Sequence, residues 1–370
     1  MKQKTKVLFL LEAFDKGGIE KVTLDIVNHL DPEKYDITVQ TFWFGGHCQS
    51  QVAEHVKVIP FFFRRYVPGV IRLIQHLSPG MLYRLFVRGK YDVEIAASDG
   101  GAAKVISGST NPHSRKVCWV HMDVVERGSK LKEFQNAETA RPIYEKFDVI
   151  APVSQACRDQ FDKKFGNRYP LKVVLNPMPV EDIQQKANAF APDYSREALN
   201  LVCVGRLVEQ KGFDRLLQAA AEIRKATLYP FHIYIIGEGP ERGDLERKIR
   251  DLNIEKYISL VGFQDNPYPY LKNADVFMLS SRDEAFPLVV GESLIVGIPV
   301  IATDCSGVRE WLKDGYYGMV LPNSTQGIYN GLMEILNHPE QLELYRSRIP
   351  EAQKEISFEE GLRKFEEILR

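Results

Sequence analysis

The sequence starts a strand–helix–strand pattern near its beginning and starts it again at Leu199, and this repetition constrains the fold more than any other feature. In the first round, Lys6–Leu11 predicts a buried strand, and Ile19–Leu30 has apolar residues at helical spacing. Tyr35–Phe42 predicts the next strand. Strands that alternate with helices form parallel sheets covered by helices on both faces, so each half predicts an α/β domain.

Further short apolar runs continue both rounds. In the first half the predicted strands are Tyr91–Ala96, Lys116–Val120, Asp148–Pro152 and Lys172–Leu175; in the second half they are Leu199–Val204, Phe231–Ile236, Tyr257–Val261, Asp275–Leu279 and Pro299–Ala302. Two such cycles predict two Rossmann-like domains, with the seam at the proline-containing stretch Asn176–Glu181. We expect domains at 1–178 and 179–350, and a final helical segment at 351–370 that packs on the first domain.

Composition limits the classes of function. The chain has 370 residues, 26% of them charged, and a net charge of -1, which gives no field for binding nucleic acid. Its five cysteines form no CxxC pair or other metal spacing, so reduced thiols are expected. The apolar run Val7–Leu11 is too short for a signal peptide, and no run is long enough to span a bilayer. These features predict a cytoplasmic protein, free or held on the inner face of the membrane.

The stretch DEAFPLVVGESL places Glu284 and Glu292 on either side of Pro287. Proline suits the first turn of a helix, because the amide that it lacks would have no partner there. The backbone amides of Phe286, Leu288 and Val289 would then form an anion site at the helix start. A phosphate between two carboxylates, each able to accept hydrogen bonds from sugar hydroxyls, fits a sugar nucleotide. The alternative is a solvated helix residue and an ordinary loop charge.

Other candidate residues follow other predicted strands. Arg206 and Lys211 stand in the loop GRLVEQKG, where two cations can hold a diphosphate. Gly17 and Gly18 follow the first strand and would let a ligand approach the backbone. His121 ends another strand. For each the alternative is structural: a solvated cation pair, a tight turn and a packed histidine.

With these residues in view, the chain resembles the family-4 retaining glycosyltransferases of the GT-B fold over nearly its whole length. The segments that carry the resemblance are FDKGGIEKVTLDIVNHL, WVHMD, VGRLVEQKGFDRLLQA, IIGEGP, LVGFQDNPYPYLKNADVFMLSSRDEAFPLVVGESL, GIPVIATD and GVREWL. The resemblance implies two Rossmann-like domains facing across a cleft, and a last helix, for which Phe358–Leu369 is the candidate, that crosses back to the first domain.

The resemblance also implies roles for individual residues. Arg206 and Lys211 would hold the diphosphate of the donor, Glu292 would bind the ribose, and Glu284 would bind the transferred hexose. The amides of Phe286, Leu288 and Val289 would assist around the sugar and phosphate, and the backbone near Phe263 and Gln264 would line the base. His121 would lie near the reacting sugar, and Gly17 and Gly18 would face the phosphate or the acceptor. A UDP-sugar is the expected donor, and no metal or other cofactor is expected. Ala285 and Pro287 depart from the glycines frequent at these positions in the family, as does Pro177 after Asn176.

The stretch from Pro60 to Lys90 has six Arg or Lys, six aromatic residues and no acid. This composition predicts contact with an anionic membrane and, with it, a glycan or lipid-linked acceptor in surface or capsular polysaccharide synthesis. A packed helical segment with a basic outer face explains the composition equally well. Ser98–Gly101 is a second candidate acceptor loop. Nothing in the sequence indicates an oligomeric state.

Two other functions share the fold. A GT-B sugar-nucleotide epimerase would use the same donor without an acceptor. A non-catalytic partner subunit would usually lose the donor charges, which this chain keeps at Arg206, Lys211, Glu284 and Glu292. A NAD-dependent dehydrogenase is disfavoured, because no G-x-G-x-x-G follows the first strand of either half.

Overall fold

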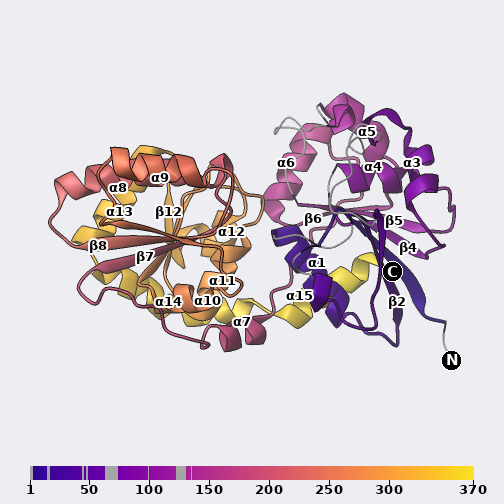
Figure 1. Ribbon diagram of the computed structural model, residues 1–370. Coiled ribbons are helices and arrows are strands. Elements are labelled where there is room, and N and C mark those ends of the chain that lie inside the picture. Colours follow the sequence, from indigo (N-terminus) through magenta and orange to yellow (C-terminus); the bar gives the residue numbers. More distant parts are fainter. Residues whose placement is uncertain are drawn as a thin grey trace. The chain divides into compact units, whose positions relative to one another are not determined.

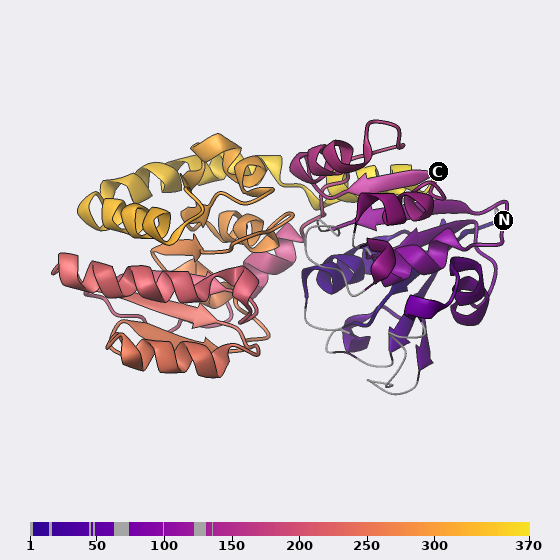
Figure 2. The same cartoon turned by 90° about the horizontal axis from the view of Figure 1, so that it is seen from above.

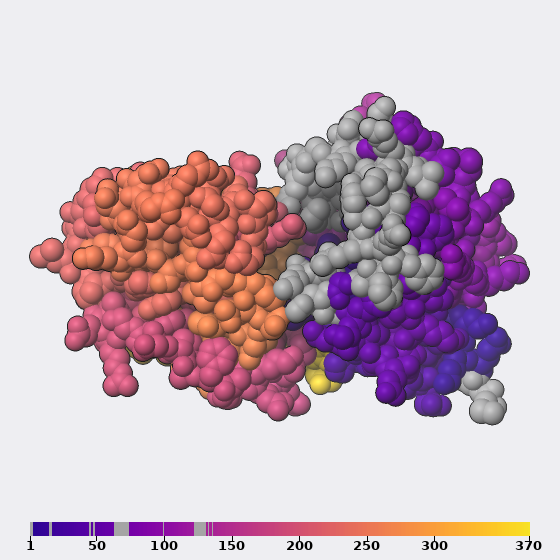
Figure 3. All heavy atoms as spheres, in the orientation of Figure 1, coloured from indigo at the N-terminus to yellow at the C-terminus, as the bar shows by residue number. Residues whose placement is uncertain are grey.

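The computed structural model describes residues 3–14, 17–43, 46, 49–62, 74–98, 100–121, 131–134 and 136–370. The chain divides into two compact units (Figure 1). The first unit is Met1–Pro177 together with Phe358–Arg370, and the second is Met178–Ser357. The space-filling view shows the described surface in sequence colours, with the remaining residues in grey (Figure 3).

The described part of the first unit contains one parallel sheet of six strands, in the order β3-β2-β1-β4-β5-β6. These strands are β1 (Thr5–Leu11), β2 (Tyr35–Trp43), β3 (Lys57–Phe62), β4 (Val93–Ala96), β5 (Arg115–Val120) and β6 (Val149–Pro152). The helices are α1 (Gly18–His29), α3 (Pro79–Phe86), α4 (Gly101–Ser107), α5 (Ala137–Tyr144), α6 (Gln155–Phe165) and α15 (Phe358–Ile368), with 3-10 turns at Gln49–Gln51 and Lys132–Phe134.

Alternate residues of the first sheet enter two different cores. Leu8 and Leu10 of β1 pack into the cluster that includes residues of α3, α4, α5 and α6. Phe9 points to the other face and stacks on Phe365 of α15 at 6.0 Å between ring centroids. Phe365 is fully buried, and burial of such a side chain contributes roughly 1.5–3 kcal/mol. The last helix therefore completes the first unit, and it lies there in both ribbon views (Figures 1 and 2).

The second unit repeats the arrangement, with described strands in the order β12-β11-β10-β7-β8-β9, all parallel. They are β7 (Leu199–Val204), β8 (Phe231–Ile236), β9 (Ile258–Gly262), β10 (Val276–Leu279), β11 (Val300–Thr303) and β12 (Gly318–Leu321). The helices are α7 (Val180–Lys186), α8 (Phe213–Ala226), α9 (Arg242–Asp251), α10 (Tyr268–Asn273), α11 (Leu288–Val296), α12 (Val308–Leu312), α13 (Thr325–Asn337) and α14 (Glu340–Glu355), with 3-10 turns η3 (Glu209–Lys211) and η4 (Lys313–Gly315).

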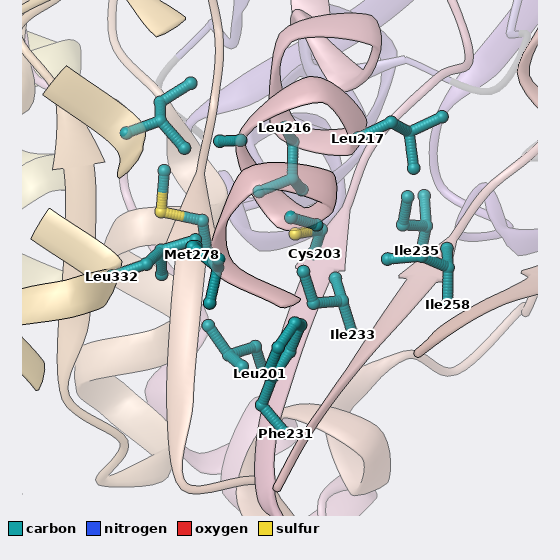
Figure 4. Packing of buried hydrophobic residues seen from close by; sticks show 14 of the residues in the cluster. Leu201, Cys203, Leu216, Leu217, Phe231, Ile233, Ile235, Ile258, Met278 and Leu332 are labelled. Carbon is teal, nitrogen blue, oxygen red and sulfur yellow. The ribbon is translucent and has the colours of Figure 1, made fainter. Parts of the chain in front are cut away.

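Alternate residues of the second sheet also enter two different cores, one on each face. Leu201 and Cys203 of β7 face the cluster formed with α8, α9 and α13, and Figure 4 shows Leu216 and Leu332 packed in this layer. Val202, between them in sequence, faces the cluster formed with α7, α10, α11 and α14. Buried runs without polar alternation are typical of parallel strands covered on both sides.

Both sheets have the strand order 3-2-1-4-5-6 of the doubly wound fold when the strands are counted within each unit. The chain leaves the first strand in one direction and returns to its other side with the fourth. In such sheets ligands bind outside the carboxyl ends of the strands, where the order reverses. The switch points are therefore between β1 and β4 in the first unit and between β7 and β10 in the second.

The structure corrects several expected boundaries. Residues 351–357 belong to the second unit, because α14 continues to Glu355 and buries Ala352 in that unit's core. The first unit ends at Pro177, one residue before the expected position. Lys172–Leu175 forms no strand, although Leu171 makes an isolated bridge with Ile150 and the amides of Lys172 and Val174 donate to the Ile150 and Pro152 carbonyls of β6. The outermost strands β3 and β12 were not expected from the sequence.

The segment from Pro60 to Lys90 agrees only in part with a membrane-facing surface. Phe61 and Phe62 pack against the core, and Tyr83 and Phe86 are buried, so these four aromatic residues are structural. Phe63, Tyr66, Arg64, Arg65 and Arg72 lie outside the described residues. The described residues that stay exposed there include Met81, Arg84 and Leu85 of α3, and Arg88, Gly89 and Lys90 after it. Among the described residues, no helix combines the length and the apolar character needed to cross a bilayer.

Candidate functional site

Two loops meet at the switch point of the second sheet. The loop after β7 carries Arg206 and then the short turn η3, which ends at Lys211. The loop after β10 runs from Ser280 to Pro287 and leads into α11. The neighbouring strand ends place the two loops side by side, because β7 and β10 are paired in register at Leu201 and Val276.

The centre of this site is an ion pair between the two loops. The Lys211 Nζ donates to Glu284 Oε1 at 2.6 Å, and Ser281 Oγ donates to the same oxygen at 2.6 Å. Glu284 is 8% exposed and Ser281 is fully buried. A buried carboxylate requires such partners, since its desolvation would otherwise cost several kcal/mol. Glu284 is therefore a fixed acceptor and not a solvated loop charge.

Two glycines make this approach of the loops possible. The Lys211 side chain passes so close to Gly205 that a Cβ there would lie 3.3 Å from Lys211 Cδ and Cε. Gly212, with φ at +64°, caps η3 in the left-handed region. A Cβ at Gly212 would lie 2.2 Å from the Ser280 carbonyl oxygen, so a larger residue would push the loops apart.

Further hydrogen bonds join the same two loops. Ser280 Oγ donates to the Lys211 carbonyl at 2.8 Å, and Gln210 Nε2 donates to the Asp283 carbonyl at 2.8 Å. The Arg282 amide donates to the Gln210 carbonyl at 2.7 Å. From the next strand, Thr303 Oγ1 donates to the Ser281 carbonyl at 2.6 Å. The loop conformation is therefore specified by bonds on several sides.

Helix α11 brings the second acid to the site. It begins at Leu288 with Pro287 as its N-cap, close to the expected start, and no side chain caps it. Glu292 lies one turn into the helix, is 6% exposed and accepts a hydrogen bond from Tyr268 Oη at 3.1 Å. The alternative, that Glu292 is an ordinary solvated helix residue, is therefore wrong.

The start of α11 fits the proposed anion site in part. The Val290 amide donates to the Pro287 carbonyl at 3.1 Å, so it is already used. The amides of Phe286, Leu288 and Val289 have no such bond to another loop within the described part of the chain. The first turn of a helix offers its amides and a partial positive charge to an anion, and here these face no capping side chain.

The other expected donor residues follow neighbouring strand ends. Arg206 is exposed and forms no ion pair with any residue that the structure describes. Phe263 and Gln264 follow β9 directly, and the Phe263 ring is 36% exposed. Arg206, Lys211, Phe263 and Glu284 therefore lie along the carboxyl edge of the second sheet, and α11 adds Glu292.

The expected residues of the first unit form a separate group. Gly17 is the N-cap of α1 and Gly18 its first residue, both exposed, after the end of β1. His121 follows β5 at the same edge of the first sheet and is 7% exposed. Its ring lies 4.4 Å from that of Trp119, and burial lowers the pKa of His121 to about 3. This imidazole is neutral at physiological pH and is not a proton donor in its resting form.

Some expected features are not described. Met122 and Asp123 of the WVHMD segment lie outside the described residues, as do Asp15 and Lys16 before Gly17. In the candidate acceptor loop Ser98–Gly101, Asp99 is also outside them, while Ser98 is buried and Gly100 caps α4. In the part of the chain that the structure describes, no three His, Cys, Asp or Glu side chains form a group able to hold a metal ion.

A polar pocket of about 370 Å³ lies elsewhere, at the amino ends of β1 and β2. Its walls are Gln3, Lys4, Lys6, Pro32, Tyr35, Asp36 and His55. This is the edge of the first sheet opposite to Gly17 and His121. Doubly wound sheets bind ligands at the carboxyl edge, so the loops at that edge form a better candidate site than this pocket.

Several residues of the site were not singled out in the sequence. They are Gln210, Asp214, Tyr268, Ser281, Arg282 and Thr303. Ser281 and Arg282 lie next to Glu284 in the motif, and this adjacency was a usable signal. Asp214 and Tyr268 reach the site only through tertiary pairing, which no local pattern reveals.

Comparison with known proteins finds a family match within the second unit. Residues 186–355 match the sequence model of the family Glycosyl transferases group 1. The chain is 28% identical over 209 residues to the N-acetylgalactosamine-N,N'-diacetylbacillosaminyl-diphospho-undecaprenol 4-alpha-N-acetylgalactosaminyltransferase of Campylobacter jejuni. This match covers 56% of this chain and 55% of that relative. It is 25% identical over 355 residues to the amylovoran biosynthesis glycosyltransferase AmsD of Erwinia amylovora, covering 91% of each chain.

Solved structures agree on the fold. Anabaena Alr3699/HepE in complex with UDP and glucose matches with a TM-score of 0.75 at 19% identity, over 99% of both chains. TarM matches with a TM-score of 0.76 at 14% identity, over 100% of this chain and 99% of the other. The strand order, the site at the switch point and these matches agree with one another. The chain therefore has the GT-B fold, and its residues 186–355 match the Glycosyl transferases group 1 domain.

Proposed function

We propose that the protein is a retaining glycosyltransferase that moves a hexose-type sugar from a UDP-sugar to a glycan or lipid-linked acceptor in surface polysaccharide synthesis. The observation that carries this proposal is the 2.6 Å pair between Lys211 and Glu284 at the switch point of the second sheet. It places a cation and a hydroxyl acceptor side by side, as a diphosphate joined to a hexose requires. Relatives named for lipid-linked and amylovoran glycosyl transfer, and the UDP complexes of HepE, support the choice of donor and acceptor.

The donor would extend along the carboxyl edge of the second sheet. Arg206 and Lys211 would bind the diphosphate, and Glu292, held by Tyr268, would accept hydrogen bonds from the ribose hydroxyls. Glu284 would accept from the hexose. The base would lie near Phe263 and Gln264, and the first amides of α11 would assist at the phosphate and sugar.

The chemistry would be transfer with retention. The bond between the anomeric carbon and the diphosphate oxygen breaks, and a bond to the acceptor hydroxyl oxygen forms on the same face of the sugar. The departing diphosphate oxygen takes the acceptor's proton, so the step needs no further reactant. Arg206 and Lys211 would stabilise the charge that develops on the diphosphate, and a preorganised donor of this kind contributes about 3 kcal/mol. Glu284 would orient the sugar, since its Oε1 already accepts two hydrogen bonds.

The acceptor side belongs in this proposal to the first unit. Gly17 and Gly18 would allow close approach of the acceptor, and neutral His121 would hydrogen-bond near the reacting sugar. Helix α3 carries two exposed apolar residues, Met81 and Leu85, and the exposed Arg84, and the exposed Arg88 follows just after the helix ends. These residues would hold the protein on the anionic inner face of the membrane, near a lipid-linked acceptor.

The test begins with the donor. Purified protein is screened with UDP-hexoses for thermal stabilisation, and the best donor is then incubated with and without lipid-linked and soluble glycan acceptors. We expect UDP release that depends on the acceptor, and a product that keeps the anomeric configuration of the donor.

The same assay separates the other functions. Conversion of the donor to its epimer without acceptor would identify an epimerase instead. Donor binding without transfer to any acceptor, even with membranes added, would favour a non-catalytic subunit.

A further inference from the structure

We infer that Arg282 is a positioning residue: with Asp214 it holds the Lys211 loop and the Glu284 loop at the spacing that lets one donor engage both. The inference rests on the proposed function for the identity of the donor. It adds a residue pair that contacts neither the diphosphate nor the sugar in the proposal above.

The contacts of Arg282 are concentrated on the other loop. Its guanidinium donates two hydrogen bonds to the Asp214 carboxylate, Nη1 to Oδ1 at 2.7 Å and Nη2 to Oδ2 at 2.8 Å. Nη1 also donates to the Glu209 carbonyl at 2.7 Å, and the Arg282 amide donates to the Gln210 carbonyl at 2.7 Å. A single residue thus contacts the η3 turn twice and the first turn of α8.

The sequence positions explain why these contacts matter for the site. Arg282 precedes Glu284 by two residues, and Glu209 precedes Lys211 by two. A shift of the Arg282 side chain therefore moves the two charged groups relative to each other. Displacement of about 1 Å in a reacting arrangement can cost about a hundredfold in rate.

The pair is too exposed for stability to be its main contribution. The side chains of Arg282 and Asp214 are 33% and 35% exposed. Ion pairs with this exposure contribute little to the free energy of unfolding, because water screens them. The hydrogen bond from Arg282 nonetheless lowers the pKa of Asp214, so the carboxylate stays charged and bonded at physiological pH. Position, not stability, is what the pair provides.

The geometry needs arginine in particular. The planar guanidinium forms two parallel bonds to one carboxylate and keeps a further donor for a carbonyl, whereas the lysine ammonium is a point charge. Arg282→Lys therefore keeps the positive charge but removes the bidentate hydrogen bonding to Asp214. The chain supplies a matched control in Arg309, which also binds a carboxylate with two nitrogens, that of Asp304. That pair lies within one segment and joins no two loops.

The first readout does not depend on activity. Amide hydrogen exchange is measured on full-length protein in peptides that cover residues 207–216 and 279–290. We expect Arg282→Lys to raise exchange several-fold in both peptides and Arg309→Lys to leave them unchanged. Unchanged exchange in Arg282→Lys would overturn the inference, whatever the enzyme transfers.

The second readout separates positioning from folding. In Arg282→Lys we expect kcat/KM for the UDP-hexose to fall at least tenfold, the Kd for UDP to change less than threefold, and the melting temperature to stay within about 2 °C. Equal losses for UDP and UDP-hexose together with a lowered melting temperature would show a merely structural role and overturn the inference.

The last readout asks whether Arg282 acts through Lys211. If it does, Arg282→Lys added to Lys211→Ala costs no more than about threefold beyond Lys211→Ala alone. Losses that multiply would show independent action and contradict the inference. If the wild type transfers no sugar at all, the proposed function fails, and the exchange experiment still decides the role of Arg282.

Discussion

The two sheets have the same strand order, but the loops at their carboxyl edges differ in kind. In the second unit, charged side chains from the loops after β7 and β10 meet at 2.6 Å and are fixed by further hydrogen bonds. In the first unit, the matching edge presents the exposed glycines of the α1 start and a buried histidine that burial keeps neutral. The fold thus supplies two equivalent positions for a ligand, and in our proposal the loop sequences decide which one receives the anion.

The largest effect is expected from removal of the cations of the second unit. Lys211→Ala and Arg206→Ala should each lower turnover about hundredfold, because each removes a cation that would stabilise the negative charge developing on the diphosphate. Turnover is measured with saturating UDP-hexose and acceptor. Lys225→Ala, on the exposed face of α8 and paired with Glu222, is the control that should keep its activity. Wild-type turnover in both site variants would remove the basis for placing the donor at this switch point.

The strands of the two units show which parts of the fold sequence patterns could predict. Central strands such as β1 and β7 were predictable, because they are buried on both faces and read as unbroken apolar runs. Of the four edge strands, β6 and β9 were predicted and β3 and β12 were not; β3 contains Pro60 and β12 begins at Gly318, residues that weaken a strand pattern. Strand formation there is a tertiary effect.

The site shows the same division. Glu284, Glu292, Arg206 and Lys211 could be singled out, because their spacing around a helix start and a strand end has a chemical meaning. The burial of Glu284 and Glu292 could not be predicted, since it depends on Ser281 and Tyr268 as partners. The link from Arg282 to Asp214 spans 68 residues and leaves no local pattern.

A smaller effect is expected for His121 in the first unit. Its folded pKa of about 3 lies below the ordinary 6.5, so the unfolded chain takes up this proton as the pH falls and the folded chain does not. Stability is therefore full above pH 6.5 and declines toward pH 3, by about 1.4 kcal/mol per pH unit. Between pH 6.5 and 5 the loss is about 2 kcal/mol.

This pH dependence is measured by chemical denaturation at several pH values, followed by a probe in the first unit. His121→Asn should be less sensitive to acid than the wild type by that amount. His113→Asn, at an exposed position of the same unit, is the control. An unchanged slope in His121→Asn would show that the histidine takes up its proton as readily in the folded protein as in the unfolded chain, and would weaken the contrast between the units.

The smallest effect is expected on the outer face of α3. Arg84→Glu with Leu85→Ser should reduce binding to vesicles that contain anionic lipid about tenfold at low salt, since each cation near such a surface contributes on the order of 1 kcal/mol. Sedimentation with anionic and with neutral vesicles measures it. If the wild type does not bind anionic vesicles, α3 is packed structure with a basic outer face. A soluble glycan is then the better candidate for the acceptor than a lipid-linked one.

The most direct test of the donor site is calorimetric binding of UDP and of the UDP-hexose to Glu292→Gln and Glu284→Gln. The ribose is present in both ligands and the hexose in only one. Each lost hydrogen bond to a buried carboxylate corresponds to about tenfold or more in affinity. We predict that Glu292→Gln weakens binding of both ligands by a similar factor, whereas Glu284→Gln weakens binding of only the UDP-hexose. Equal losses for both ligands in both variants would contradict it.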